Sequence, residues 1–149
     1  MHDIEVQFAT TSKVALPKQK DFTVWANIAI TVTHKSVKEI TIRIVDSDEM
    51  QKLNKTYRNK DSSTNVLAFP CDEANSNYLG DIVICAATVE KEATEQNKSL
   101  MAHFAHLTIH GCLHLLGYEH QNDAQAQKME TLEIELLKTL NYTNPYNQT

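Results

Sequence analysis

Residues 99–116, SLMAHFAHLTIHGCLHLL, and the following GYEH that ends at His120 form the stretch that decides the fold. Ser99 is a favourable N-terminal cap, and the residues after it are apolar on most sides, which predicts a buried helix. We expect the helix to end at Gly117, because glycine adopts the left-handed conformation that closes many helices. A helix of this kind has to be covered on several sides, so the sequence predicts that it is central.

Shorter apolar segments surround this helix along the chain. Alternating or continuous apolar residues predict strands at 3–9, 38–46, 64–69 and 80–86. Amphipathic spacing or composition predicts further helices at 17–33, 47–57, 86–97 and 123–140, the first beginning at Pro17 and the second capped by Ser47. Interspersed strands and helices predict an α/β or α+β fold, and residues 1–149 show no repeat or linker that would divide them into domains.

Composition narrows the class of protein. The 149 residues are 42% hydrophobic and 22% charged, which is typical of one globular domain rather than a disordered or fibrous chain. The first residues lack the features of a secretory signal, and no apolar run is long enough to cross a membrane. We therefore expect a cytoplasmic protein with no membrane partner. The three cysteines have no CxxC spacing and are expected to be free thiols.

Charge alone does not indicate a nucleic-acid ligand. The net charge is -5, yet residues 1–60 carry ten Lys and Arg against seven Asp and Glu. Lys52, Lys55, Arg58 and Lys60 could form a local basic patch for RNA. On charge alone, we prefer to interpret them as the solvated face of a helix.

Three histidines, His110, His114 and His120, lie at the end of the central helix and just beyond it. Residues four apart lie about 40° apart around a helix axis, so His110 and His114 share one face. His120 cannot continue that face in a straight helix. A turn at Gly117 can bring its imidazole back, so the sequence predicts that the three imidazoles meet at one metal ion.

Three neutral imidazole nitrogens suit zinc and leave at least one coordination position open, although nickel, copper or another divalent ion also suits them. An open position is typical of a catalytic ion, which acts as a Lewis acid and lowers the pKa of bound water to about 7. His103 and His106, on the same helix, are interpreted as core residues. Cys112 points to another side of the helix and is interpreted in the same way.

Metzincin proteases have the same histidine spacing, with a glutamate after the first histidine as the general base. The corresponding residue here is Gly111, which argues against peptide hydrolysis by that route. Glycine inside a helix costs about 1 kcal/mol relative to alanine. We hypothesise that Gly111 clears space for a bulky substrate beside the metal.

The segment HGCLHLLGYEH at 110–120 resembles the histidine motif of the YbeY family, bacterial metal-dependent endoribonucleases of ribosomal RNA maturation. Two other segments, LNKTYRNKDSSTNVLAFP at 53–70 and LGDIVI at 79–84, are similar to marked segments of that family in the same order. NYTNPY at 141–146 resembles the usual end of these proteins. Two departures, Asn59 for a common glycine and Ala68 for a common serine, bear on fine substrate preference only.

The resemblance implies an α/β (α+β) fold with a small mixed four-stranded sheet, about five helices and a central metal-bearing helix. It implies one zinc ion on His110, His114 and His120, and a functional Arg58. The implied substrate is single-stranded RNA, including the precursor end of small-subunit ribosomal RNA. The implied setting is late ribosome assembly and quality control, with the small ribosomal subunit and its proteins as partners.

Some residues have two interpretations from the sequence. Arg58 is either a substrate contact at the start of a polar loop or a cation favoured at a helix C-terminus, and the resemblance favours the first. Arg43, in mid-strand, is expected to point outward. Asp81 could orient a ligand imidazole, but we prefer to interpret it as a turn residue. Glu119 could replace the missing base, but we prefer a solvated loop acid.

Three functions are consistent with these features. The first is a zinc-dependent endoribonuclease of ribosomal RNA, in which an arginine fork and a metal stabilise charge on the reacting phosphoryl group. The second is a metallohydrolase of another substrate. The third is a ribosome-assembly binding module in which zinc has a mainly structural role. The open coordination position disfavours the third, and the missing glutamate disfavours a peptidase.

Overall fold

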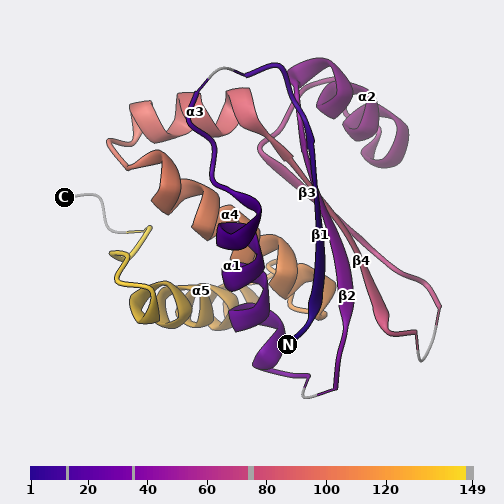
Figure 1. Ribbon diagram of the computed structural model, residues 1–149, viewed down its shortest axis with the longest axis vertical. Helices are drawn as coiled ribbons and strands as arrows, with labels where there is room; N and C mark the ends of the chain where they lie inside the picture. Colours follow the sequence, from indigo (N-terminus) through magenta and orange to yellow (C-terminus); the bar gives the residue numbers. More distant parts are fainter. Residues whose placement is uncertain (13, 35, 74–75, 147–149) are drawn as a thin grey trace.

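The computed structural model describes residues 1–12, 14–34, 36–73 and 76–146 and shows a mixed sheet with helices mostly on one face (Figure 1). Its elements are β1 (Asp3–Ala9), α1 (Gln19–Thr31), β2 (Glu39–Val45), α2 (Ser47–Arg58), β3 (Val66–Pro70), β4 (Tyr78–Cys85), α3 (Ala86–Glu95), α4 (Leu100–Leu115) and α5 (Asp123–Thr139). Within the described residues, the predicted small mixed sheet, five helices and α+β class are confirmed. No described helix has the length and hydropathy that a bilayer crossing requires.

The sheet has the strand order β1-β2-β4-β3. β1 and β4 each pair with β2 in parallel, and β3 pairs with β4 antiparallel. β3 is therefore an edge strand, and it ends at Pro70, a residue that cannot donate a ladder hydrogen bond. The alternation of strand side chains sends Ile42 and Ile82 into the main core and Arg43 to the other face.

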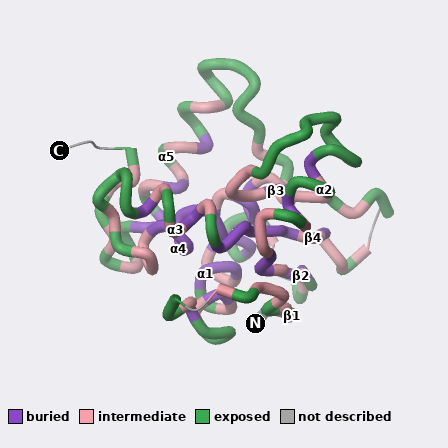
Figure 2. Tube along the Cα trace, turned by 90° about the horizontal axis from the view of Figure 1, so that it is seen from above, coloured by how far each residue is buried: buried purple, intermediate pink, exposed green. Residues whose placement is uncertain are grey.

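α4 lies against the covered face of the sheet and contacts α1, α3, α5, β3 and β4 (Figure 1). Figure 2 shows buried residues concentrated where α4 meets the sheet. The predicted central position of this helix follows from its composition. His103, His106 and Cys112 are buried within it, as expected, and Cys71, Cys85 and Cys112 are free thiols.

The opposite face of the sheet is covered only in part, by α2 (Figure 1). A smaller apolar cluster joins the two layers there: Val45, Met50, Leu67, Val83 and Cys85. Arg43 lies on this face and donates two hydrogen bonds to Glu49, at 2.6 and 3.0 Å. Its predicted outward direction is confirmed.

One predicted helix cap and one predicted helix start are wrong, although α2 begins at Ser47 as predicted. α2 is capped by Asp46 rather than Ser47, and the Asp46 carboxylate accepts hydrogen bonds from Thr10 and Thr11 at the end of β1. α1 begins at Gln19, two residues after Pro17, because Lys18 is the cap and its backbone N–H donates to the side chain of Asp21. Residues 147–149 of the expected tail lie outside the described residues.

Candidate metal centre

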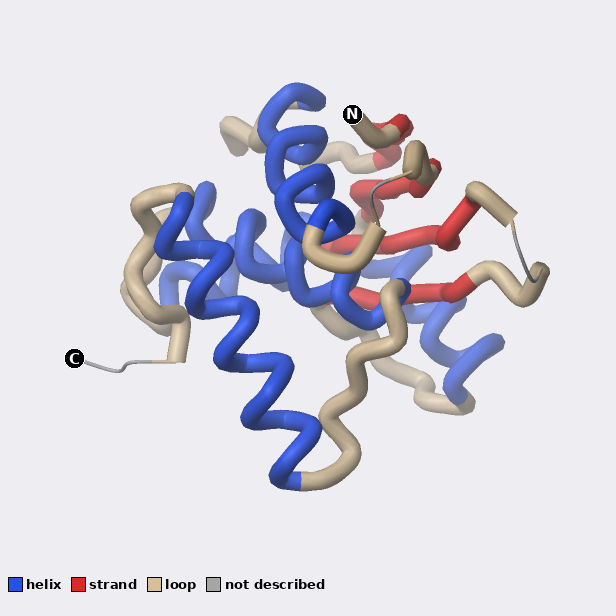
Figure 3. The backbone as a smooth tube through the Cα atoms, turned by 90° about the horizontal axis from the view of Figure 1, so that it is seen from below, coloured by secondary structure: helices blue, strands red, loops and turns tan. Residues whose placement is uncertain are grey.

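The C-terminal end of α4 has the geometry that brings His120 back toward the helix. Gly117 has φ +99°, a left-handed value. The Gly117 N–H donates to His114 O and the Tyr118 N–H to Leu113 O, both at 3.0 Å, which is a Schellman closure. The loop then turns away toward α5 (Figure 3). A backbone reversal at one glycine thus places a loop histidine beside two helical ones.

The structure brings the three predicted ligands together. One ligand atom from each of His110, His114 and His120 lies within 4.8 Å of the other two. Ring centroids are 4.6 Å apart for His110 and His114, 5.6 Å for His110 and His120, and 4.9 Å for His114 and His120. His110 and His114 are partly buried on α4, while His120 is exposed. The group can therefore be reached from solvent on the side of His120.

A buried carboxylate, which the sequence interpretation missed, orients His110. Glu133 of α5 has 0% exposure, and its Oε2 lies 3.0 Å from His110 Nδ1. Its Oε1 accepts from His106 Nε2 at 2.5 Å and from the hydroxyl of Tyr146 at 2.7 Å. Burial acts to raise the pKa of Glu133, but the hydrogen bonds from His106 and His110 outweigh it and lower the pKa to about 2.

A sequence signal for Glu133 was present. In α5 it follows Met129 by four residues and precedes Leu136 and Leu137 by three and four, so it lies on the apolar face. A carboxylate on such a face needs buried partners. His106, Glu133 and His110 also lie close enough to hold a cation. Their short distances are those of imidazole N–H groups donating to a carboxylate, which identifies an orienting network rather than a second centre.

The donor atoms fit a divalent metal ion. Because the Nδ1–H of His110 is directed at Glu133, its Nε2 carries the lone pair, and this atom lies 3.1 Å from Nε2 of His114. Burial, followed by the charges of His110 and His120, lowers the pKa of His114, which favours the neutral imidazole that a metal requires.

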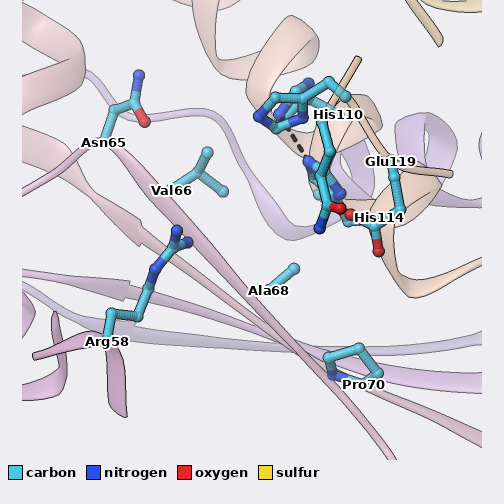
Figure 4. Close-up of a pocket in the computed structure, with 11 residues that line it drawn as sticks. Arg58, Asn65, Val66, Ala68, Pro70, His110, His114 and Glu119 are labelled. Carbon is cyan, nitrogen blue, oxygen red and sulfur yellow. Dashed lines mark hydrogen bonds between the residues drawn. The ribbon is translucent and has the colours of Figure 1, made fainter. Parts of the chain in front are cut away.

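These histidines line one pocket of about 440 Å³ at the edge of the sheet. Its opposite wall is made of Arg58, at the end of α2, of Asn65, just before the edge strand, and of three residues of that strand: Val66, Ala68 and Pro70. Figure 4 shows Arg58 across β3 from the histidines, with its guanidinium extended toward Val66. Arg58 is thus placed in the same pocket as the histidines, although it comes from a distant part of the chain.

Glu119 and Asp81, the two carboxylates for which the sequence left two interpretations, lie in different parts of the structure. Glu119 is exposed and lines the pocket beside His114 (Figure 4). Asp81 lies within β4 rather than in a turn, and it accepts a hydrogen bond from Tyr78. The carboxylate that contacts His110 is Glu133, not Asp81.

Gly111 packs against the sheet. A Cβ on this residue would lie 2.9 Å from Cγ2 of Ile82 in β4, closer than side chains tolerate. Gly111 also lines the pocket of the three histidines, so the hypothesis that it clears space for substrate stays a prediction. The glycine lets α4 approach β4 closely, and this approach places His110 and His114 at the pocket.

Two comparisons with known proteins bear on the family and the fold of this chain. The family model described as endoribonuclease YbeY matches residues 6–141. Among solved structures, the solution structure of TM1509 from Thermotoga maritima is similar, with a TM-score of 0.57 and 23% sequence identity. The match covers 95% of this chain and 99% of the other. At this identity the structural likeness supports the fold alone.

Proposed function

Because this chain belongs to the family of endoribonuclease YbeY, we propose that it is a metal-dependent endoribonuclease that cuts single-stranded RNA during late maturation of small-subunit ribosomal RNA and in ribosome quality control. Family membership gives the coarser part, an RNA-cleaving hydrolase of ribosomal RNA processing. The observation that carries the metal dependence is the convergence of His110, His114 and His120 in the pocket that Arg58 also lines.

His110, His114 and His120 would hold one ion. Zinc is the metal we propose, because three neutral imidazoles and an open position suit it, and nickel or another divalent ion is the alternative. When bound, the ion would supply a Lewis acid beside the reacting phosphoryl group. The Glu133 carboxylate would keep Nδ1 of His110 protonated, so that Nε2 stays available.

Arg58 would bind the phosphate of the scissile bond. Its guanidinium offers donors in a planar fork that can contact two phosphate oxygens. The positive charge of the guanidinium stabilises the negative charge that develops on the phosphoryl group during cleavage. Arg43 is committed to Glu49 on the other face of the sheet and cannot take this role. The negative end of the helix dipole would by itself favour a cation at the C-terminus of α2, where Arg58 lies. The position of Arg58 in the pocket supports a contact with substrate as well.

Glu119 would accept the proton of the attacking water. Of the described residues that line the pocket, it is the one with a carboxylate. A general base needs to be within reach of the nucleophile, and the exposed loop position of Glu119 permits this. The net charge of -5 gives little general attraction for RNA. We therefore propose that the small subunit and its proteins help to present the substrate in the cytoplasm.

Cleavage of an end-labelled single-stranded RNA tests this function. Four samples are compared: metal-loaded protein, chelator-treated protein, and the metal-loaded Arg58→Ala and His114→Ala variants. We expect cleavage only by the first, with bound metal lost from His114→Ala and retained by Arg58→Ala. A double-stranded RNA of the same sequence tests strand preference.

Equal cleavage in all four samples would indicate a contaminating nuclease and would contradict the proposal. Stoichiometric zinc in His114→Ala would contradict the ligand assignment. Loss of circular dichroism on chelation would instead support a structural ion, with zinc required for folding rather than for cleavage.

A further inference from the structure

The apolar face of α2 becomes exposed toward its C-terminal end. Met50, Leu53 and Tyr57 share one face by their spacing, yet Met50 has 0% exposure and Tyr57 has 66%. The Tyr57 ring packs edge-on against Phe69 of β3, with 5.2 Å between ring centroids. Figure 2 shows most of α2 exposed. Tyr57 is thus an aromatic ring held in place by Phe69 and open to solvent over much of its surface.

A second pocket, of about 390 Å³, lies where α2 leaves the open face of the sheet. Leu53, Tyr57, Phe69 and Val83 form its apolar walls, and polar side chains complete it: Gln7, Thr41, Arg43, Glu49 and Asp81.

The charged groups of this second pocket already have partners. Arg43 donates from Nε and Nη2 to Glu49 and from Nη1 to Gln7. Asp81 accepts a hydrogen bond from the hydroxyl of Tyr78. The pocket therefore offers apolar walls and paired polar groups. Such a surface matches a flat, uncharged ring with polar edges, which is a nucleobase, better than it matches a phosphate.

The second pocket and the metal pocket share the same two segments. Tyr57 lines the second pocket and the next residue, Arg58, lines the metal pocket. Phe69 lines the second pocket, while Ala68 and Pro70 line the metal pocket. Because strand residues alternate in direction, the two pockets lie on opposite sides of the edge strand β3. A strand of RNA with a phosphate at Arg58 would pass beside Tyr57.

The charge of this region complements RNA. Residues 52–60 carry Lys52, Lys55, Arg58 and Lys60 and no carboxylate, and all four cations are exposed. Proteins that bind single strands combine such cations, which follow the backbone, with aromatic rings on which bases stack. We propose that Tyr57, supported by Phe69, stacks a base of the RNA substrate in the second pocket. This inference rests on the proposed function and adds a base-binding subsite to it.

Binding of a short fluorescently labelled single-stranded RNA, followed by anisotropy, tests the subsite. Wild type is compared with Tyr57→Leu, which removes the ring, and with Tyr57→Phe, which keeps it. Phe8→Leu is the matched control, because Phe8 is 47% exposed and packs on Phe22 at the other face of the sheet. Metal-loaded and chelated protein are both used, RNA integrity is checked on a gel, and folding is checked by circular dichroism.

We expect Tyr57→Leu to weaken binding by about 5- to 150-fold, the range for loss of one base–aromatic stack. Tyr57→Phe and Phe8→Leu should bind as wild type does. RNAs with one abasic nucleotide then locate the stacked base. At one position, removal of the base should weaken binding to wild type. Removal of the same base should not weaken binding to Tyr57→Leu, because the two changes remove the same contact.

Equal affinity of Tyr57→Leu and wild type would overturn the subsite. So would a Tyr57→Leu penalty that persists with every abasic RNA, because the ring would then act through the packing of α2. Wild type that sediments as a dimer while Tyr57→Leu sediments as a monomer would assign the face to a second copy of the chain. A Tyr57-dependent stack without cleavage would overturn the proposed function alone, and absence of RNA binding by wild type would overturn both.

Discussion

Tyr146 donates a hydrogen bond of 2.7 Å to the buried carboxylate of Glu133, whose other oxygen lies 3.0 Å from Nδ1 of His110. A residue beyond α5 is thereby connected to the candidate metal centre through one side chain. Lys98 supports this arrangement, because its Nζ donates to the Pro145 carbonyl at 2.8 Å. The segment before Tyr146 is thus held against the N-terminal end of α4.

Glu133→Gln should weaken metal binding without unfolding the protein. An amide oxygen is a poorer acceptor than a carboxylate and cannot serve two imidazoles equally well, so His110 would lose its fixed orientation. We expect an affinity loss of about 10- to 100-fold, and a smaller loss for Tyr146→Phe. A zinc competition titration measures both. Glu135→Gln on the exposed side of α5 is the control, and unchanged affinity in Glu133→Gln would refute the orienting role.

Arg58→Lys should lower cleavage nearly as much as Arg58→Ala. Lysine keeps the charge but lacks the planar fork, so two phosphate oxygens are no longer contacted together. We expect kcat/KM to fall by about 10²- to 10³-fold with bound metal unchanged. Lys60→Ala, two residues away and also exposed, is the control for charge alone. Full activity in Arg58→Lys would show that the fork is not required.

Glu119→Gln should remove the proton acceptor and leave the ion in place. We expect cleavage to fall by about 10²- to 10⁴-fold, the usual contribution of a general base. Metal content, measured on the same sample, should stay stoichiometric. If the variant loses metal together with activity, Glu119 acts on the histidine cluster rather than on the nucleophile.

Gly111→Ala should destabilise the fold through contact with Ile82. The added Cβ would lie 2.9 Å from Ile82 Cγ2, so the helix or the side chain has to move. Overpacking of this kind costs about 1–3 kcal/mol, and alanine recovers about 1 kcal/mol of helix propensity. Urea unfolding measures the difference. Ile82→Val keeps Cγ2 but removes the Cδ1 atom, which leaves room for the Ile82 side chain to move. The double variant Gly111→Ala with Ile82→Val should therefore recover part of the stability that Gly111→Ala loses.

His103 should make stability depend on pH near neutrality. Burial lowers its pKa from 6.5, against the opposing effect of Glu92 at 2.8 Å, and the charges of Lys98 and His106 lower it further. Because the pKa is lower in the folded chain, the unfolded chain binds more protons as the pH falls. The stabilisation of the fold by neutral His103 is therefore present above pH 6.5 and is lost as the pH falls below it.

Unfolding of wild type and His103→Gln between pH 8 and pH 5 isolates this contribution. One proton gives a slope of at most about 1.4 kcal/mol per pH unit, and wild type should show the steeper loss toward acid. Parallel stability curves for the two proteins would contradict the shift.

Much of the architecture follows from local patterns. Alternating isoleucines indicate β2, Ser99 and Gly117 mark the limits of the central helix, and its apolar surface requires burial, because these signals depend on neighbours in the chain. The cap of α2 could not be predicted in this way. The Asp46 side chain makes no cap hydrogen bond and instead accepts hydrogen bonds from Thr10 and Thr11, which follow β1.

The sequence by itself determined that His110 and His114 share a helical face and that Gly117 permits the chain to return with His120, because these are properties of backbone periodicity and glycine. Only the tertiary structure decided which carboxylate orients His110, why position 111 is glycine, and that Arg58 and Tyr57 line two different pockets. These relationships join α5, β4 and α2 to the central helix. Packing between elements distant in the chain sets them, and no local periodicity carries that information.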